Sequence, residues 1–257
     1  MAGFYRHLGE NRYLATPHTA GPWSTESQHL GPPSALLVRE MENLAPRADM
    51  AFARVVFDVL GPVPVAELAV SASVVRPGRS VELLGAELRH GGRAVLRAQA
   101  WRISRGDTAP LATEFSGMLP EPRMCPSMEM PSDWRCGYLD AVDWRSVDGG
   151  IFTPGDAVVW GKPLLPTVQD EESTALQRMF AITDSASGVS SRLDIRKWFA
   201  INTDLTVHLH REPEGSWFAL DAETAIGSGG VGVATSVVHD LLGPVGRTAQ
   251  SLFVRER

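Results

Sequence analysis

The segment DLTVHLHREPEGSWFALDAETAIGSGGVGVATSVVHD, residues 204–240, decides the fold of this chain. Polar and apolar side chains alternate at its start, and a period of two is typical of a half-buried strand. Proline and glycine at 213–215 and a glycine pair at 229–230 then interrupt the pattern, as turns do. The segment therefore predicts successive antiparallel strands joined by short turns.

A second segment, LAVSASVVRPGRSVELLGAELRHGGRAVLRAQAWRI at 68–103, repeats this order of features. In each segment a strand that ends in arginine is followed by a Pro/Gly turn, an alternating strand, a glycine pair and another strand. The interval in sequence from Arg76 to Arg211 is nearly equal to the interval from Gly92 to Gly230. Two landmarks at nearly the same spacing predict an internal duplication.

One helix is predicted ahead of the strands in each half. The stretch PPSALLVREMENL, residues 32–44, has apolar residues at helical spacing and proline near its start, where helices tolerate it. The stretch DEESTALQRMFAITDSA, residues 170–186, has acidic residues for a first turn and an apolar stripe after them. A lone helix beside one antiparallel sheet buries such a stripe by lying across a face of the sheet.

These elements predict an α+β fold made of two similar units. Each unit is expected to be an antiparallel sheet wrapped around one long helix. The two units are expected to pair edge to edge within the chain, which would cover exposed edge strands. The Pro- and Met-rich stretch 119–140 has no clear period and is interpreted as a linker. The two units are then residues 1–118 and 141–257.

The composition excludes several classes of protein. A net charge of −6 without a basic run argues against a nucleic-acid-binding protein, and no apolar run reaches the ~18 residues of a membrane span. The first residues have no apolar core of signal-peptide length, so a cytoplasmic location is expected. Cys125 and Cys136 fit no metal-binding spacing and are expected to be free thiols.

Three stretches carry a resemblance to a known family: HLGPPSALL at 29–37, FAINTDLTVHLHR at 199–211 and RTAQSLFVR at 247–255. They are similar to the entry to the central helix, a strand ending in a His-Arg pair, and the last strand of acyl-CoA thioesterase II and its thioesterase-like relatives. The resemblance covers most of the chain and is weak at positions 1–30 and in the linker. It implies the double hotdog fold, in which two hotdog units share one chain.

The resemblance also implies a catalytic site. In that family an Asp near the end of the second helix, a Thr on a strand and a Gln on the last strand together hold a water molecule. These roles fall on Asp184, Asn202 and Gln250, with Asn202 standing where the family has Thr. The implied reaction is hydrolysis of an acyl-CoA thioester to the free acid and CoA, without a cofactor, in a homodimer or larger assembly.

The chemistry of these residues fits that reaction. Of the three, only Asp184 can take a proton from the water, and burial would raise its pKa and make it a better base. The expected substrate contacts are Gly31, Thr203 beside Asn202, and Arg211 near the CoA. Backbone N–H groups at a helix start can polarise a carbonyl, and those near Gly31 or at the start of the second helix are both candidates. Arg192 and Arg196 are weaker candidates for the CoA.

Simpler interpretations remain open. Asp184 could hydrogen-bond nearby backbone at a helix end, and Gln250 could lie on a solvated sheet face. The alternative function is a non-catalytic protein of hotdog fold that binds acyl thioesters or acts as a scaffold, and Asn202 favours it. Whether the first half keeps a site is also open, because Glu40 or Glu42 could correspond to Asp184 or simply face solvent.

Two further motifs carry less weight. His208 and His210 lie on one face of a strand and could form half of a metal site, but a solvated or interface position is the preferred interpretation. The glycines of 227–232 match the spacing G-x-G-x-x-G, yet a β-branched stretch follows them instead of a helix, so they predict a hairpin turn. The chain lacks the G-x-S-x-G of serine hydrolases.

Overall fold

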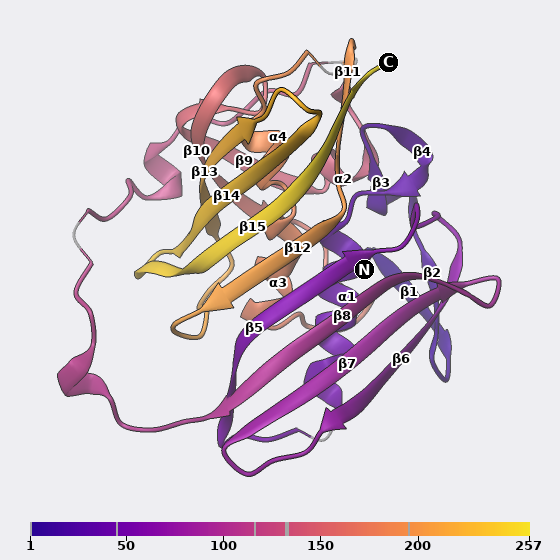
Figure 1. Ribbon diagram of the computed structural model, residues 1–257, viewed down its shortest axis with the longest axis vertical. Helices are drawn as coiled ribbons and strands as arrows, with labels where there is room; N and C mark the ends of the chain where they lie inside the picture. The colour runs from indigo at the N-terminus through magenta and orange to yellow at the C-terminus, as the bar shows by residue number, and fades with distance from the viewer. Residues whose placement is uncertain (1, 45, 116, 132–133, 195) are drawn as a thin grey trace.

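A computed structural model describes residues 2–44, 46–115, 117–131, 134–194 and 196–257. Within these ranges the first half contributes six strands and one helix to the main body of the fold, and the second half contributes seven strands and three short helices (Figure 1). In the first half these are β1 (Tyr5–Gly9), β2 (Arg12–Ala15), α1 (Gly31–Asn43), β5 (Met50–Val59), β6 (Glu67–Arg76), β7 (Val81–His90) and β8 (Arg93–Ser104).

In the second half they are α2 (Gly137–Asp140), β9 (Val142–Gly150), β10 (Thr153–Pro163), α3 (Ala175–Thr183), α4 (Ala186–Val189), β11 (Trp198–Asn202), β12 (Asp204–Leu209), β13 (Phe218–Ile226), β14 (Val231–Asp240) and β15 (Gly243–Glu256). A separate pair, β3 (Ala20–Gly21) and β4 (Ser24–Gln28), precedes α1. Short 3-10 helices lie in connecting segments at Pro17–Thr19, Ala109–Leu111 and Pro122–Met124.

The strands of the two halves form one continuous sheet. Its order is β1-β2-β6-β7-β8-β5-β12-β15-β14-β13-β10-β9, with β11 also paired to β15. The expected edge-to-edge pairing is confirmed, because β5 and β12 run antiparallel with Phe57 opposite Leu205 and Val55 opposite Val207. The two predicted sheets are therefore parts of one large sheet, because this pairing lets the edge strands of both halves complete one another's hydrogen bonds.

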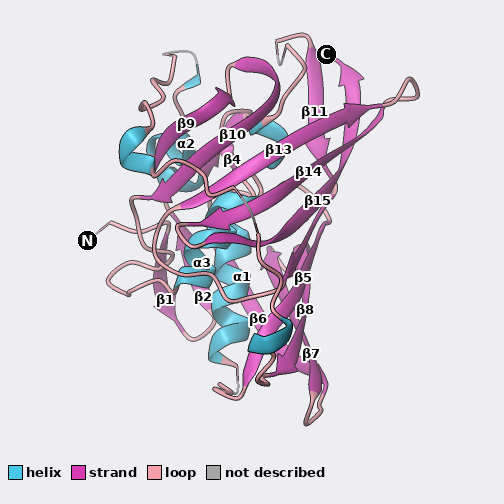
Figure 2. Cartoon of the chain, turned by 90° about the vertical axis from the view of Figure 1, so that its left-hand side faces the viewer, coloured by secondary structure: helices cyan, strands magenta, loops and turns pink. Residues whose placement is uncertain are grey.

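The two helices α1 and α3 lie side by side and pack on the same face of the sheet (Figure 2). Leu36, Leu37 and Met41 of α1 are fully buried there. Phe180 of α3 meets Phe57 of the seam strand β5 edge-on, with ring centroids 5.6 Å apart. Burial of these apolar side chains between the helices and the curved sheet provides the core.

The helix predicted at 32–44 is confirmed almost to the residue, but the second helix is much shorter than predicted. The helix α3 has nine residues and begins after Thr174, whose hydroxyl accepts a hydrogen bond from the Gln177 backbone N–H at 3.1 Å. Such an N-cap fixes the first residue of a helix. The acidic residues 170–172, expected in the first turn, therefore precede the helix, and Asp170 has a left-handed backbone with φ of +63°.

The internal duplication is present in the strand pairing. Val56 of β5 lies opposite Gln99 of β8, and Thr206 of β12 lies opposite Ala249 of β15. The pairing of β5 with β8 therefore repeats, in the same register, as the pairing of β11 and β12 with β15.

The spacing of the repeat differs from the predicted one. Each half has an irregularity at the equivalent place, between Phe52 and Arg54 within β5 and at the junction of β11 with β12. The prediction paired Arg76 with Arg211 wrongly, because Arg76 ends β6 whereas Arg211 follows β12.

The stretch interpreted as a linker packs closely on the second half. Cys125 is buried, and Tyr138 in α2 is fully buried. The Tyr138 hydroxyl donates to the Ala181 carbonyl at 2.8 Å, and the indole N–H of Trp160 donates to the Pro120 carbonyl at 3.0 Å.

The boundaries of the two units stay a prediction. Cys125 and Cys136 are free thiols, and the glycines 227–232 form the predicted hairpin turn between β13 and β14.

Candidate active site

The candidate active site lies where the start of α1 meets the end of α3. Gly31 makes this approach possible, since a Cβ atom on it would overlap the Ala181 carbonyl oxygen. The close approach brings Asp184, the C-cap of α3, beside the first residues of α1. Gly31 therefore has a packing role that its position at a helix start did not reveal.

Asp184, Asn202 and Gln250 converge at this point, as the resemblance implies. The carboxylate oxygen Oδ1 of Asp184 accepts hydrogen bonds from Nδ2 of Asn202 and from Nε2 of Gln250, both at 2.8 Å. Nε2 of Gln250 also donates to the Asp184 carbonyl at 3.1 Å, and its Oε1 accepts from the Ser187 backbone N–H. Gln250 is fully buried, so it does not lie on a solvated face.

The bulge where β11 joins β12 decides which side chains enter the site. Asn202 lies opposite Leu252, while Thr206 beyond the bulge lies opposite Ala249, so the register slips by one residue between them. Thr203 sits at the slip, is exposed, and directs its hydroxyl to Asp204 Oδ1 at 3.3 Å. The structure therefore brings Asn202 to Asp184 and leaves Thr203, an expected substrate contact, outside the cluster.

His29 belongs to this cluster, although sequence reasoning assigned it no role. Its Nδ1 lies 3.3 Å from Oδ2 of Asp184 and accepts the Gly31 backbone N–H at 3.1 Å. The imidazole stacks on the ring of Tyr138, with centroids 3.8 Å apart. The available signal was its place directly before Leu30 and Gly31, at the entry to the helix. The role of Tyr138 had no signal, because it lies in the stretch interpreted as a linker.

Burial dominates the proton affinity of both groups. It raises the pKa of Asp184 to about 7, although hydrogen bonds from Asn202, the Leu30 backbone and Gln250 act in the opposite direction. Burial likewise lowers the pKa of His29 to about 3, so its imidazole is neutral at pH 7. A carboxyl group with a pKa near neutral pH is suited to general-base catalysis.

Gly31 is not placed to polarise a substrate carbonyl with its backbone N–H. That N–H already donates to His29, and the Leu30 backbone hydrogen-bonds Asp184. The next two residues, Pro32 and Pro33, have no N–H to offer. The backbone donors at the start of α1 are thus used by His29 and Asp184.

Arg211, the third expected substrate contact, has a structural role far from Asp184. All five of its N–H groups donate to protein oxygens: two to the carboxylate of Asp240, at 2.6 and 2.5 Å, and the others to carbonyls of Glu212, Gly243 and Pro244. Among the weaker candidates, Arg192 donates to Asp156 at 2.6 Å.

The histidines of β12 and its end lie outside the cluster. His208 is exposed, and His210 contacts the ring of Phe115 at 5.0 Å between centroids. Among the residues that the structure describes, no three His, Cys, Asp or Glu side chains are grouped as metal ligands would be. Within the same ranges, no helix is long and apolar enough to cross a membrane.

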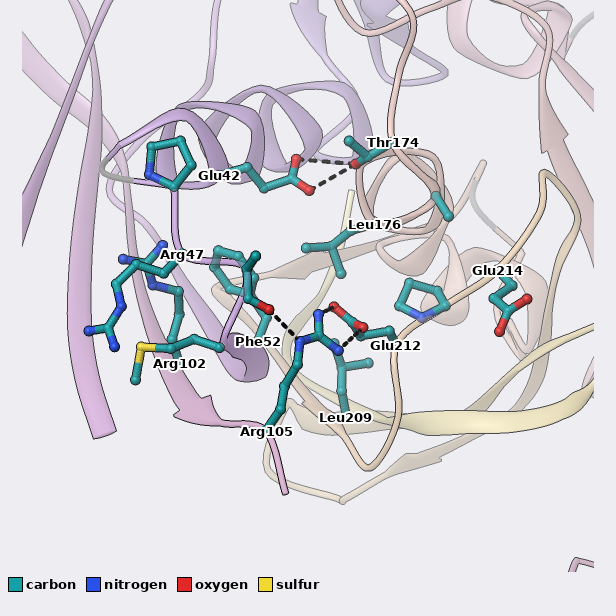
Figure 3. A pocket seen from close by; sticks show the side chains of 15 residues that line it. Glu42, Arg47, Phe52, Arg102, Arg105, Thr174, Leu176, Leu209, Glu212 and Glu214 are labelled. Carbon is teal, nitrogen blue, oxygen red and sulfur yellow. Dashed lines mark hydrogen bonds and ion pairs between the residues drawn. The ribbon is translucent and has the colours of Figure 1, made fainter. Parts of the chain in front are cut away.

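Asp184 is buried, and the larger of two cavities lies at the opposite end of the helix pair. This cavity has a volume of about 540 Å³ and is lined by residues around the end of α1 and the start of α3 (Figure 3). A smaller one, of about 310 Å³, lies near Trp134 and Phe152. Neither is lined by Asp184, which is 5% exposed, so a substrate needs local opening beside Asn202 and His29.

Replacing Gly31 with alanine is expected to destabilise the protein by about 1–3 kcal/mol and to reduce activity, because the added Cβ forces α1 away from α3. Thermal unfolding and thioester hydrolysis would be measured together. The matched control is Gly188→Ala in α4, where an added Cβ meets nothing within 4 Å and is expected to stabilise by about 0.5–1 kcal/mol. Equal stability of Gly31→Ala and the wild type would contradict the close approach.

Comparisons with known proteins agree with this arrangement. The model of the acyl-CoA thioesterase N-terminal domain matches residues 19–103, and that of the C-terminal domain matches residues 122–254. A search of curated proteins by sequence found no match.

Among solved structures, the chain is similar to a hotdog-fold protein from Alicyclobacillus acidocaldarius, at 15% identity, with 98% of this chain and 95% of that one covered and a TM-score of 0.74. It is also similar to an acyl-CoA thioesterase II from Mycobacterium marinum, at 13% identity, with the same coverage and a TM-score of 0.68. These likenesses show the hotdog fold. With both family models matched in order along the sequence, the chain belongs to the acyl-CoA thioesterase family.

Proposed function

We propose that this protein hydrolyses acyl-CoA thioesters to the free acid and CoA, with Asp184 as general base. The observation that carries the proposal is the convergence of Asn202 and Gln250 on Oδ1 of Asp184, each at 2.8 Å. Membership of the acyl-CoA thioesterase family supports the substrate class. In this proposal the two amides fix the carboxyl group and hold the attacking water against it.

The reaction follows from the proton balance at Asp184. The ionised carboxylate takes a proton from water while the water oxygen forms a bond to the thioester carbonyl carbon. The C–S bond then breaks, and the departing thiolate takes the proton from Asp184, which restores the carboxylate. Water and Asp184 supply nucleophile and base, so we propose that no cofactor takes part.

The rate of hydrolysis is expected to rise with pH around neutrality. The pKa of Asp184 is about 7, and only its ionised form can accept the proton, so log kcat/KM should climb below pH 7 and level off above it. The measurement is release of free thiol from a panel of short- to long-chain acyl-CoAs between about pH 5 and 9. A rate that stays constant from pH 5 upward, as expected for an Asp with its ordinary pKa of 3.8, would argue against a buried base.

The closed site favours one alternative, a protein that binds acyl thioesters without hydrolysing them. Asp184 is 5% exposed, and its Oδ1 already accepts two hydrogen bonds. The same panel separates the two functions, because tight binding of an acyl-CoA with no thiol release at any chain length would select the binding protein. A cytoplasmic location and a homodimer or larger assembly remain predictions.

A further inference from the structure

The duplicated halves are related by a two-fold arrangement that gives the catalytic site a counterpart. The strand pairings of one half repeat in the other, and the seam between β5 and β12 is symmetric about Val56, which lies opposite Thr206. The same correspondence places Phe52 in the position of Asn202 and Ala100 in the position of Gln250. The counterpart therefore lies at the other end of the helix pair, where α1 ends and α3 begins.

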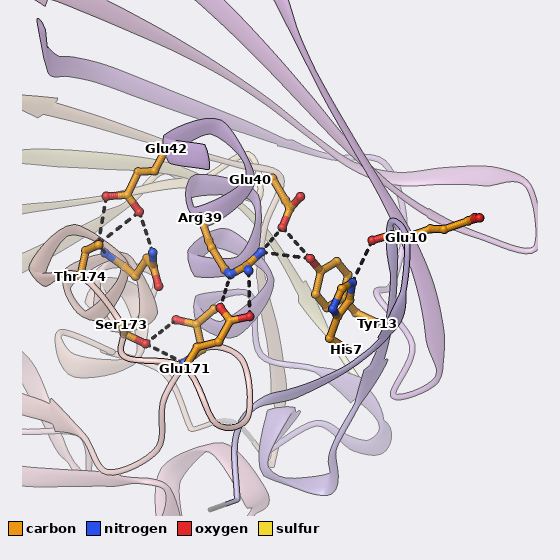
Figure 4. Close-up of polar contacts among 11 residues, drawn as sticks. His7, Glu10, Tyr13, Arg39, Glu40, Glu42, Glu171, Ser173 and Thr174 are labelled. Carbon is orange, nitrogen blue, oxygen red and sulfur yellow. Dashed lines mark hydrogen bonds and ion pairs between the residues drawn. The ribbon is translucent and has the colours of Figure 1, made fainter. Parts of the chain in front are cut away.

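A carboxylate lies at this end too. Glu42, near the end of α1, accepts a hydrogen bond from the hydroxyl of Thr174, the N-cap of α3, at 2.9 Å, and another from Nε2 of Gln177 at 2.7 Å (Figure 4). In the first site Asp184 likewise hydrogen-bonds the N-cap of α1, there through the backbone of Leu30. Glu40, the other candidate for this role, instead accepts from the Tyr13 hydroxyl on a different side of the helix.

The larger cavity opens beside Glu42. Its wall includes Phe52 and Thr174, the counterparts of Asn202 and Leu30, so it occupies the place of the catalytic site under the two-fold arrangement. Part of its wall is apolar, with Leu176 and Leu209 beside Phe52, and charged side chains such as Arg105 and Glu212 form another part (Figure 3). A volume of about 540 Å³ is within the range of small-molecule sites.

The charges at the rim of the cavity limit what it can hold. Arg105 binds Glu212 through both terminal nitrogens, Arg47 binds Asp49 at 2.6 Å, and Arg102 binds Glu82. These arginines are therefore neutralised by acidic neighbours and offer little attraction to the phosphates of CoA. The cavity suits an apolar chain with an uncharged polar group, which is the chemistry of an acyl chain on a pantetheine arm.

We propose that this cavity is a second binding site, which holds an acyl-pantetheine thioester without hydrolysing it. The inference rests on the proposed function, because it assigns the same substrate class to the counterpart of the catalytic site. Hydrolysis is absent here because Phe52 and Ala100 supply neither of the amides that hold the water in the first site. The chain then binds two acyl thioesters and hydrolyses one.

The test is the stoichiometry of binding, measured by isothermal titration with a non-hydrolysable S-alkyl thioether of CoA. The wild type is expected to bind two equivalents per chain. Ala48→Trp and, independently, Ala175→Trp place a large ring at the mouth of the cavity and are expected to bind one. The matched control, Ala112→Trp on the exposed connecting segment, is expected to bind two. Thermal unfolding verifies that each variant is folded.

Binding of one equivalent by the wild type, or of two by both cavity variants, would overturn the second site. A free fatty acid of the same chain length serves as competitor. If an equal concentration of the acid abolishes binding of the second equivalent of thioether, the cavity binds the acid and not the thioester. These outcomes are separate from the proposed function. Thiol release together with one bound equivalent would overturn the second site but not the proposed hydrolysis. Two bound equivalents without thiol release would overturn the hydrolysis but not the second site.

Discussion

Asp184→Asn is expected to slow thioester hydrolysis by about 10²–10⁴-fold, the range of a general base. Asparagine keeps the size of the side chain and an oxygen that can accept from Asn202 and Gln250, but it cannot take a proton from water. The loss should appear in kcat, with a smaller effect on KM. The measurement is release of free thiol from the best acyl-CoA of the panel.

The control for this variant is Asp221→Asn, an exposed carboxylate on β13 that should leave the rate unchanged. Stability provides a second readout. Burial raises the pKa of Asp184 from 3.8 to about 7, so the folded state holds an extra proton and the contribution of this group to stability falls as the pH rises through that window. Asn carries no such proton, so the variant should unfold at a higher temperature than wild type at pH 8. Unchanged turnover would remove Asp184 from the mechanism.

Asp240→Ala is expected to lower the free energy of unfolding by about 2–3 kcal/mol, because it leaves the half-buried Arg211 guanidinium and two backbone N–H groups without their acceptor. The Asp240 side chain is fully buried and accepts two hydrogen bonds from Arg211, one from the Glu214 N–H and one from the Leu242 N–H. Chemical denaturation measures the loss. If Arg211 served mainly to bind CoA, the variant would instead show near-normal stability and a raised KM.

The pH dependence of this effect has the opposite sign to that of Asp184. Burial acts to raise the pKa of Asp240, but the hydrogen bonds from Arg211 and the two backbone N–H groups outweigh it, so the pKa lies below 3.8. Its stabilising contribution is therefore present above that value and is lost as the pH falls through the lower pKa of the folded state. The difference between wild type and Asp240→Ala should shrink in acid. Asp221→Ala, at an exposed position, is the control and should stay within ~0.5 kcal/mol of wild type.

Sequence alone could predict the features that follow from local periodicity. The alternation around 204–240, the apolar spacing of α1 and the glycine turn at 227–232 depend on neighbouring residues, and the structure has all three. The repeat was also visible, but its spacing was misjudged because glycines and arginines were used as landmarks. The true markers of register are the irregularities after Phe52 and Asn202, and a bulge has no fixed residue type.

The remaining features depend on contacts between distant segments. His29 joins the site only because Gly31 lets α1 approach α3, and Tyr138 reaches it from a stretch without any period. Arg211 was assigned to the substrate because its charge is visible in the sequence, whereas its buried partner Asp240 is 29 residues away. The closure of the site and the cavity beside Glu42 follow from packing of both halves, which no single stretch of sequence describes.

The seam between β5 and β12 has a consequence for how this protein can evolve. In a symmetric dimer of identical chains, any substitution appears in both subunits, so a change that spoils one active site spoils its twin. Here the two halves are encoded separately but share one sheet, and each can accumulate its own changes. Phe52 and Asn202 are an example of such a difference, because one end of the helix pair lacks the amide that the other end has.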